Sequence, residues 1–354
     1  TGIDPAIVDE TIIGCVSQPA DAANIARVIA LRSGIPESTP AMTVHRNCAS
    51  GMESLTTAAE RAATGNGEVF VVGGTENMSR IPLLYSAAAA AKFAALARAK
   101  TWGGKAAAAV NFRPRDFAPI IGLRLGLTDP VAGLGMGQTA EILARDFSIS
   151  RKEQDTFALE SHLKAAAAKE KLRDEMCPVY LPKAPDGFVM NDNGVRENQS
   201  LEALAKLRPV FERNTGTVTA GNSSQITDGA VALLVMTESR ANVIGLEPLG
   251  RLAGYAYTGC DPKRMGLGPA YAIRKAAERI GLKPNDADVV EINEAFAAQA
   301  VPCIEQLELD PETVNVNGGA IALGHPLGAS GARLVTTLAH EMSVGSHRYG
   351  LASM

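Results

Sequence analysis

The chain repeats itself over a long distance. A pattern that begins at Gly2, Gly-(Ile/Leu)-x-Pro-x-x-x-Asp-x-x-x-Ile, returns at Gly281, which is 279 residues later. A second pair of segments begins at Ser50 and Ser330, 280 residues apart, and shares Ser-Gly, Thr-Thr and Ala at matching positions. Two separate segments at nearly the same offset indicate a duplicated supersecondary unit. The chain is therefore predicted to contain two related halves.

Each half alternates apolar runs with alanine-rich runs of helical length, which predicts α/β layers around mixed sheets. Strands are expected at 41–44, 68–74, 229–236, 249–257 and 348–354, and helices after Cys48, at 268–280 and from the turn at His325 to Met342. The strand at 249–257 and the helix at 268–280 have no counterpart before Gly2. The sequence is therefore expected to be part of a longer protein.

One histidine stands in a glycine-rich stretch between Asn315 and Arg333. The segment Gly324-His325-Pro326 leads directly into a predicted helix. Glycine lets a backbone come close to a ligand, and a helix N-terminus favours negative charge. The stretch is thus suited to a site where an oxyanion develops, although a capped loop with a surface histidine would have the same pattern.

A cysteine occupies the corresponding turn of the first half. Cys48 lies between the predicted strand 41–44 and an alanine-rich helix, with Asn47 and Ser50 beside it. A thiol at a helix N-terminus is expected to have a lowered pKa and to be reactive. The other four cysteines are interpreted as small buried hydrophobic residues: Cys15, Cys177, Cys260 and Cys303. Their scattered spacing predicts neither disulfides nor a zinc site.

A third segment places a polar residue at the end of an apolar strand. The run Val290-Glu-Ile-Asn-Glu-Ala-Phe-Ala297 changes from strand to loop at Asn293. Loops that follow a rigid strand commonly carry functional side chains. Asn293 is therefore a third candidate site residue.

Together these segments resemble the thiolase family over essentially the whole chain. The family combines a Cys-x-Ser-Gly nucleophile loop with Asn-Glu-Ala-Phe and Gly-His-Pro loops, and here these are Cys48–Gly51, Asn293–Phe296 and Gly324–Pro326. Further segments similar to the family are Gly73–Ser79, Met136–Glu141, Ser150–Asp155 and Gly216–Asn222.

The resemblance implies a thiolase fold: two duplicated α/β halves in α/β/α/β/α layers, plus an inserted loop domain that covers the substrate and binds coenzyme A. The expected divisions are 1–80 with 225–245 for the N-terminal half, 81–224 for the loop domain and 246–354 for the C-terminal half. Arg196 and Ser224 match family contacts to the coenzyme, whereas Met136, Met265 and Phe296 match substrate-binding positions. A solvated charge at Arg196 and core methionines are the simpler alternatives.

The resemblance also implies roles for the three loops. Cys48 would be the nucleophile that carries the acyl group, His325 its base and oxyanion donor, and Asn293 the holder of a water that completes the oxyanion site. In the family a second cysteine protonates the departing carbanion, and that position is expected beyond Met354. No tightly bound cofactor and no metal are expected, because coenzyme A is a substrate.

Composition limits the remaining classes. A net charge of −4 with mixed signs gives no basic footprint for nucleic acid, and no apolar run is long enough to span a bilayer. A bacterial-like cytoplasmic enzyme is predicted, with mitochondria and peroxisomes left open, and a homodimer or homotetramer follows from the resemblance. A hydratase–dehydrogenase subunit of an oxidation complex is a candidate partner.

The predicted reaction is cleavage of a 3-ketoacyl-CoA by coenzyme A in fatty-acid β-oxidation. Gly135 leaves room for a long acyl chain, and Asp192–Arg196 resembles oxidation-complex subunits. The alternatives are a short-chain acetoacetyl-CoA thiolase, which performs acetyl transfer, and a thiolase-like lipid-binding protein without catalysis.

Overall fold

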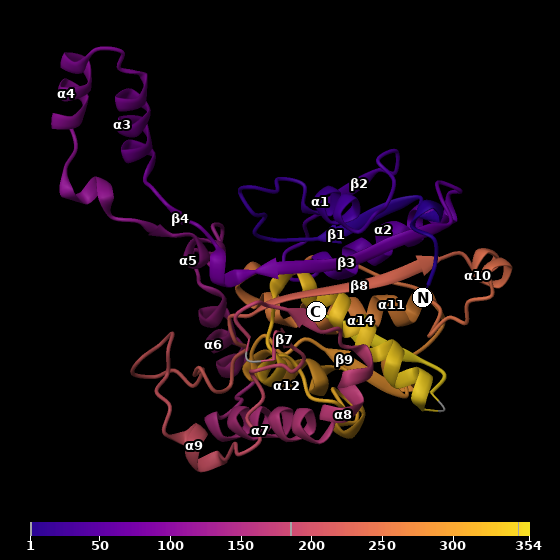
Figure 1. Cartoon of the computed structure of the whole chain (residues 1–354). Coiled ribbons are helices and arrows are strands. Elements are labelled where there is room, and N and C mark those ends of the chain that lie inside the picture. Colours follow the sequence, from indigo (N-terminus) through magenta and orange to yellow (C-terminus); the bar gives the residue numbers. More distant parts are fainter. Residues whose placement is uncertain (1, 185, 346) are drawn as a thin grey trace. The chain divides into compact units, whose positions relative to one another are not determined.

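A computed structural model describes residues 2–184, 186–345 and 347–354. The chain divides into two compact units. Unit 2 is Arg80–Met136, and unit 1 is formed by the residues up to Ser79 together with Gly137–Met354. Figure 1 labels most of their elements.

The strands of unit 1 are β1 (Glu10–Gly14), β2 (Ala41–Val44), β3 (Val69–Asn77), β6 (Val179–Tyr180), β7 (Phe188–Val189), β8 (Asp228–Met236), β9 (Val289–Ile292) and β10 (Gly350–Ser353). Its helices are α1 (Ile25–Arg32), α2 (Ser50–Ala63), α6 (Met136–Asp146, whose first residue ends unit 2), α7 (Arg151–Ala167), α8 (Lys169–Leu172), α9 (Leu201–Ala205), α10 (Glu238–Ile244), α11 (Gly268–Arg279), α12 (Ala297–Gln306), α13 (Ala320–Leu323) and α14 (Leu327–Val344).

The first sheet has the strand order β2-β1-β3-β8. The first three strands are parallel, and β8 is antiparallel to β3 along its full length. Side chains alternate between faces along a strand. Val69 and Val71 of β3 accordingly pack in the cluster that includes Ala30 of α1, whereas Phe70 and Val72 pack with Ala58 of α2.

Two helices lie between the sheets. α14 packs against α2, contacts β3 and β8 of the first sheet, and contacts β9 and β10, which form the second, parallel sheet. A further cluster joins β9 to α11 and α12 through Val290, Ile273 and Cys303. The order of layers is α1, first sheet, α2 with α14, second sheet, α11 with α12. The predicted layered α/β fold is confirmed.

The strand expected at 249–257 is wrong, because these residues form no ladder in the structure. A strand needs a neighbour for its backbone groups, and β9 and β10 pair with each other. The tyrosines of this segment instead reach α2: the Tyr257 hydroxyl lies 2.7 Å from Thr56 Oγ1, and Tyr255 donates to Glu60.

Two of the four cysteines expected to be buried are not. Cys15 and Cys303 are buried, but Cys177 and Cys260 are exposed. Both exposed cysteines lie outside helices and strands, where no sheet or helix covers them. Within the described residues, no helix combines the length and apolar character needed to cross a membrane.

Unit 2 contains a short antiparallel ribbon, β4 (Leu83–Leu84) with β5 (Ile120–Ile121), and the helices α3 (Ala87–Arg98), α4 (Trp102–Val110) and α5 (Gly122–Gly126). Its interior is a small aromatic cluster in which Phe93 lies 4.8 Å from Phe112 and 5.0 Å from Tyr85 between ring centroids.

Candidate active site

Cys48 lies in the turn between β2 and α2. Ser50 closes this turn, because its Oγ accepts the N–H of Arg46 at 2.9 Å and donates to the Asn47 carbonyl at 2.6 Å. Asn47 has a φ of 46°, a left-handed conformation that asparagine tolerates better than most residues. The turn holds the thiol at the N-terminus of α2.

The thiol is less acidic than the sequence indicated. Burial raises the pKa of Cys48 to about 11, and the Glu76 carboxylate adds to the effect. A backbone hydrogen bond lowers the pKa but is outweighed. The expected lowering at the helix N-terminus is therefore wrong, since loss of solvent has the larger effect. Cys48 needs a base to become a nucleophile.

His325 is suited to be that base. Its side chain is buried, and burial, followed by the charge of Arg333, lowers its pKa to about 4. The imidazole is thus neutral at pH 7. It follows Gly324, whose φ of 104° is open to glycine.

Ser330 determines which imidazole nitrogen carries the proton. Its Oγ lies 2.6 Å from His325 Nδ1 and donates to the Pro326 carbonyl at 3.0 Å. The serine hydroxyl has one proton, so when that proton is on the carbonyl, Oγ accepts the Nδ1–H. The lone pair of the neutral ring is then on Nε2. Sequence reasoning missed this role, although Ser330 was visible in the internal repeat.

Asn293 lies beside that lone pair, in the turn that follows β9. Its Nδ2 is 3.5 Å from His325 Nε2, and its backbone N–H donates to the Ser353 carbonyl at 3.0 Å. Its Oδ1 is buried and accepts no hydrogen bond from any residue that the structure describes. A buried amide oxygen is costly without a donor. The site therefore suits a small donor at this position.

Glycines bring the starts of α2 and α14 together. A Cβ at Gly51 would overlap the Ala332 amide nitrogen and lie 3.1 Å from the Gly328 carbonyl oxygen. Gly51 and Gly328 are each the second residue of their helix. The first turns of the two helices are therefore in contact, and Cys48 and His325 each precede one of these glycines by three residues.

A buried carboxylate, that of Glu76, supports the same junction. Its Oε2 accepts the N–H groups of Gly328 at 2.9 Å and Val16 at 3.0 Å, and Oε1 accepts that of Ser17 at 2.9 Å. It thus ties β3, the Cys15 loop and the first turn of α14 together. Sequence analysis found Glu76 only as part of a segment similar to a family.

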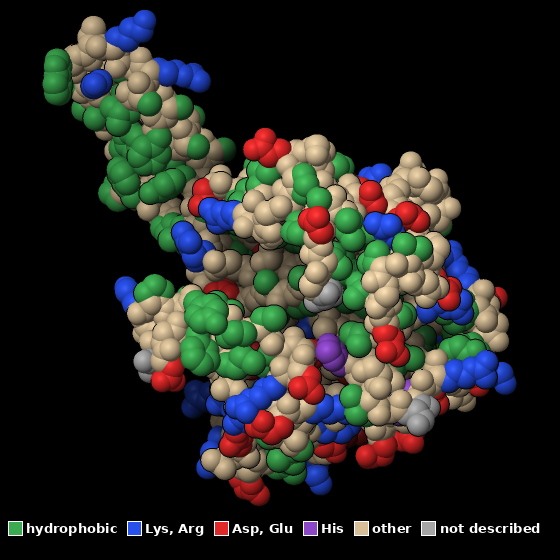
Figure 2. All heavy atoms as spheres, turned by 45° about the vertical axis from the view of Figure 1, so that its right-hand side comes forward, with side chains coloured by type: hydrophobic (Ala, Val, Ile, Leu, Met, Phe, Trp, Pro, Cys, Tyr) green, Lys and Arg blue, Asp and Glu red, His purple; other side chains and the backbone are tan. Residues whose placement is uncertain are grey.

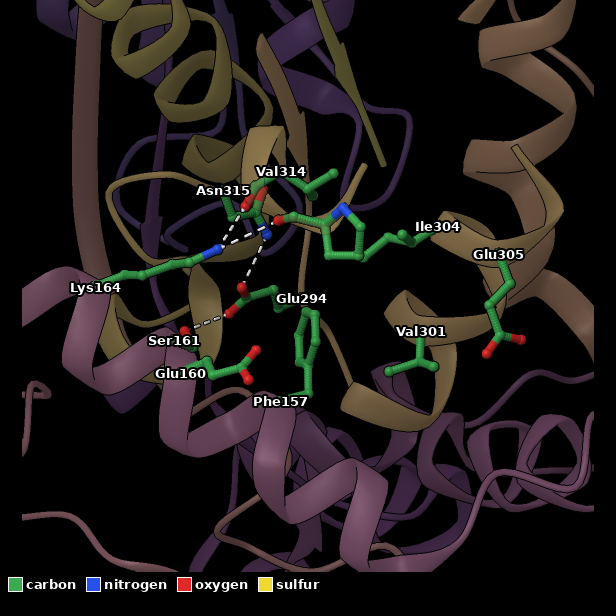
Figure 3. A pocket seen from close by; sticks show the side chains of 11 residues that line it. Phe157, Glu160, Ser161, Lys164, Glu294, Val301, Ile304, Glu305, Val314 and Asn315 are labelled. Atoms are coloured by element: carbon green, nitrogen blue, oxygen red, sulfur yellow. Dashed lines mark hydrogen bonds between the residues drawn. The ribbon is translucent and has the colours of Figure 1, made fainter. Parts of the chain in front are cut away.

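A cavity of about 160 Å³ lies next to the Asn293 loop (Figure 3). Its lining includes Glu294, whose buried carboxylate accepts hydrogen bonds from Ser161 at 2.7 Å and Asn315 at 2.8 Å. None of the three candidate catalytic residues lines it. Glu294 is fully bonded within the protein, so its role is to hold the loop.

The predicted binding residues are only partly brought together. Ser224 donates its N–H to the Ala295 carbonyl at 3.0 Å, which places it beside Phe296. The exposed Arg196 donates its backbone N–H to the buried His162 at 3.1 Å. Met265 and Met136 are half-buried, in a 3-10 turn and at the start of α6. Among the described residues, no hydrogen bond joins Arg196 or Met265 to Asn293 or His325.

A cysteine at one helix start, a neutral histidine at the neighbouring start and an amide beside the imidazole form the arrangement used in acyl transfer through a thioester. The chain belongs to the thiolase family. Residues 1–239 match the family model for "Thiolase, N-terminal domain", and residues 246–354 match "Thiolase, C-terminal domain". The protein is an acyltransferase.

The names of similar proteins agree with this assignment to the thiolase family. The chain is 43% identical over 349 residues to a "Probable acetyl-CoA acyltransferase" of Staphylococcus aureus, covering 97% of this chain and 83% of that protein. It is similar to the crystal structure of the Bacillus anthracis acetyl-CoA acetyltransferase (38% identity, TM-score 0.88, 99% and 85% of the chains covered). It is equally similar to human mitochondrial 3-ketoacyl-CoA thiolase in complex with CoA (38%, TM-score 0.87, 99% and 84%).

Proposed function

We propose that this chain cleaves 3-ketoacyl-CoA with coenzyme A, giving acetyl-CoA and a shortened acyl-CoA, in fatty-acid β-oxidation. In reverse, the same site would perform a Claisen condensation. The observation that carries the proposal is the buried His325 imidazole, which contacts Ser330 through Nδ1 and Asn293 through Nε2 at the start of α14, the helix that packs against α2, whose start follows Cys48.

In the proposed mechanism, His325 Nε2 takes the proton of the Cys48 thiol. The thiolate attacks the C3 ketone, and the oxyanion that forms is stabilised by the imidazolium and by a water held on Asn293. The C2–C3 bond then breaks, leaving an acyl group on Cys48 and an acetyl-CoA carbanion that takes a proton from a second acid. Coenzyme A finally gives its thiol proton to the conjugate base of that acid and attacks the thioester, and the departing Cys48 thiolate takes its proton back from His325.

For substrate binding we propose the inserted loop domain, 81–224, with Arg196 and Ser224 contacting the coenzyme. Met136, Met265 and Phe296 remain candidates for contact with the acyl chain. Coenzyme A acts as a substrate in this scheme, and no tightly bound cofactor takes part.

The length of the acyl chain of the substrate distinguishes the proposed function from its alternative, the short-chain acetoacetyl-CoA thiolase. The two solved relatives described above have equal identity to this chain, and one is a 3-ketoacyl-CoA thiolase while the other is an acetyl-CoA acetyltransferase. Gly135 favours the longer acyl chain, because glycine leaves space where a side chain would fill it. The acetoacetyl-CoA thiolase remains the second candidate function.

The test is intact mass spectrometry of the protein after incubation with 3-ketopalmitoyl-CoA or with acetoacetyl-CoA. A palmitoyl-derived C14 adduct, lost on adding coenzyme A and absent in Cys48→Ala, supports the proposal. An acetyl adduct alone indicates the short-chain enzyme. The matched control is Cys177→Ala, which removes an exposed thiol outside the site. An unmodified protein with both substrates contradicts both activities and favours a lipid-binding relative.

Assembly and location stay predictions. We propose a homodimer or homotetramer, with a hydratase–dehydrogenase subunit as candidate partner, in the cytoplasm of a bacterium. Light scattering of the purified protein measures its oligomeric state, and co-purification tests for the hydratase–dehydrogenase partner.

A further inference from the structure

The charges of unit 2 differ from those of the rest of the chain. Residues 80–136 contain eight Lys and Arg against two Asp and no Glu, a net charge of +6. The remaining residues contain 26 Lys and Arg against 36 Asp and Glu, a net charge of −10. The basic residues of unit 2 are Arg80, Lys92, Arg98, Lys100, Lys105, Arg113, Arg115 and Arg124.

The same unit exposes its large apolar side chains. Trp102 is 87% exposed, and Val110 and Val131 are each 84% exposed. All four residues of the β4–β5 ribbon are exposed, and so is Leu125 of α5. Figure 2 shows hydrophobic side chains gathered over much of this unit, with Lys and Arg side chains at one end of it.

Unit 2 is too small to bury this surface by itself. Its aromatic cluster leaves Tyr85 and Phe117 half exposed, at 50% and 55%. Its two-stranded ribbon is of a kind that has marginal stability alone. A concentration of exposed apolar groups on a small unit marks an interaction surface.

We propose that unit 2 binds the surface of membranes that contain anionic phospholipids. Aliphatic side chains and one tryptophan would enter the headgroup region, while Lys and Arg pair with lipid phosphates. Short helices with basic and apolar residues lie in the interface in this way without crossing the bilayer. The positive charge favours an anionic surface over a neutral one, and Trp102 is of the type that prefers the interface.

Two other kinds of binding partner, nucleic acid and protein, fit this surface of unit 2 less well. A nucleic-acid site would be expected to present aromatic side chains for stacking along a basic groove, whereas the exposed side chains here are mostly Leu, Ile and Val. A protein partner would be expected to meet mixed charges at the rim of the surface, and unit 2 is nearly all basic. Aliphatic side chains surrounded by positive charges are instead complementary to the surface of an anionic lipid bilayer.

The chain carries its own reporter, because Trp102 is its single tryptophan. The experiment titrates the purified protein with vesicles of phosphatidylcholine, with and without phosphatidylglycerol, and records tryptophan emission. Insertion shifts the emission to shorter wavelength, and lipids brominated near the headgroup quench it. We expect both effects with phosphatidylglycerol vesicles only, and binding weakened at least about tenfold at high salt.

The decisive variant is Arg98→Glu/Lys100→Glu/Lys105→Glu, which reverses three exposed charges near Trp102. It should abolish the shift while the far-ultraviolet circular dichroism spectrum and the urea unfolding midpoint, which report the fold, stay unchanged. The matched control, Lys152→Glu/Arg251→Glu/Lys283→Glu, makes the same change of charge on exposed residues of unit 1 and should bind vesicles as before.

Three results would overturn the proposal. The first is unchanged emission with anionic vesicles, and the second is an equal shift with neutral vesicles. The third is emission that is already at short wavelength and depends on protein concentration, which would show that a second copy of the chain covers this surface.

Discussion

Replacing Ser330 with alanine tests the proposed state of His325 most directly. The change removes the acceptor 2.6 Å from Nδ1 and the donor to the Pro326 carbonyl. A buried polar atom left without a partner costs about 1–3 kcal/mol. If Nδ1–H loses its partner, the ring can move its proton to Nε2, where it cannot accept the Cys48 proton.

If that cost falls on the transition state, kcat/KM should drop roughly 5- to 150-fold, since about 1.4 kcal/mol is a factor of ten. The assay is thiolysis at several pH values together with the rate of acyl adduct formation by rapid-quench mass spectrometry. Both should fall by the same factor, with little change in KM.

Thr337→Val is the matched control, because it also removes a buried hydroxyl from α14, one that donates to Glu175 at 2.8 Å. It should lower the free energy of unfolding without slowing acylation. The reasoning is refuted if Ser330→Ala keeps the wild-type acylation rate, or if both variants lose activity to the same degree.

Four further outcomes are expected. Cys48→Ala should form no acyl adduct, whereas Asn293→Ala should form it about 10- to 100-fold more slowly than the wild type. Intact mass spectrometry over time distinguishes the two variants, and turnover by Cys48→Ala would refute the proposed mechanism. Glu76→Gln should lose about 1–3 kcal/mol in urea unfolding, because one amide oxygen cannot serve three N–H donors as a carboxylate does; an unchanged midpoint would contradict this. Gly51→Ala should cost about 3 kcal/mol or more, because its Cβ overlaps α14, while Gly103→Ala, also the second residue of a helix but with open space, should change stability by no more than about 1 kcal/mol. Stability should fall as pH drops from about 6.5 to about 4, because the unfolded state protonates His325 before the folded state does; a pH series of denaturation midpoints, flatter in His325→Gln, measures it.

Local pattern was enough to select the three candidate catalytic loops and to predict most of the elements that carry them. β2 and α2 flank Cys48 where the change from strand to helix pattern placed them. The internal repeat predicted that the helix after Cys48 and the helix after His325 are equivalent, and the structure packs these two helices together. The prediction of a strand at 249–257 was wrong, because a strand needs a neighbouring strand to pair with. An apolar run in the sequence does not show whether such a neighbour exists.

The sequence by itself determined the family, the duplicated α/β halves and the residue types at the site, because these depend on periodicity and on motifs of a few neighbouring positions. Only the tertiary structure decided the chemical state of those residues. Burial makes Cys48 a weak acid and His325 a neutral base, which reverses the expectation for the thiol. Ser330 and Glu76 gained their roles from contacts that form when α14 packs against α2 and β3, and the pKa of a group depends on how much solvent such packing removes.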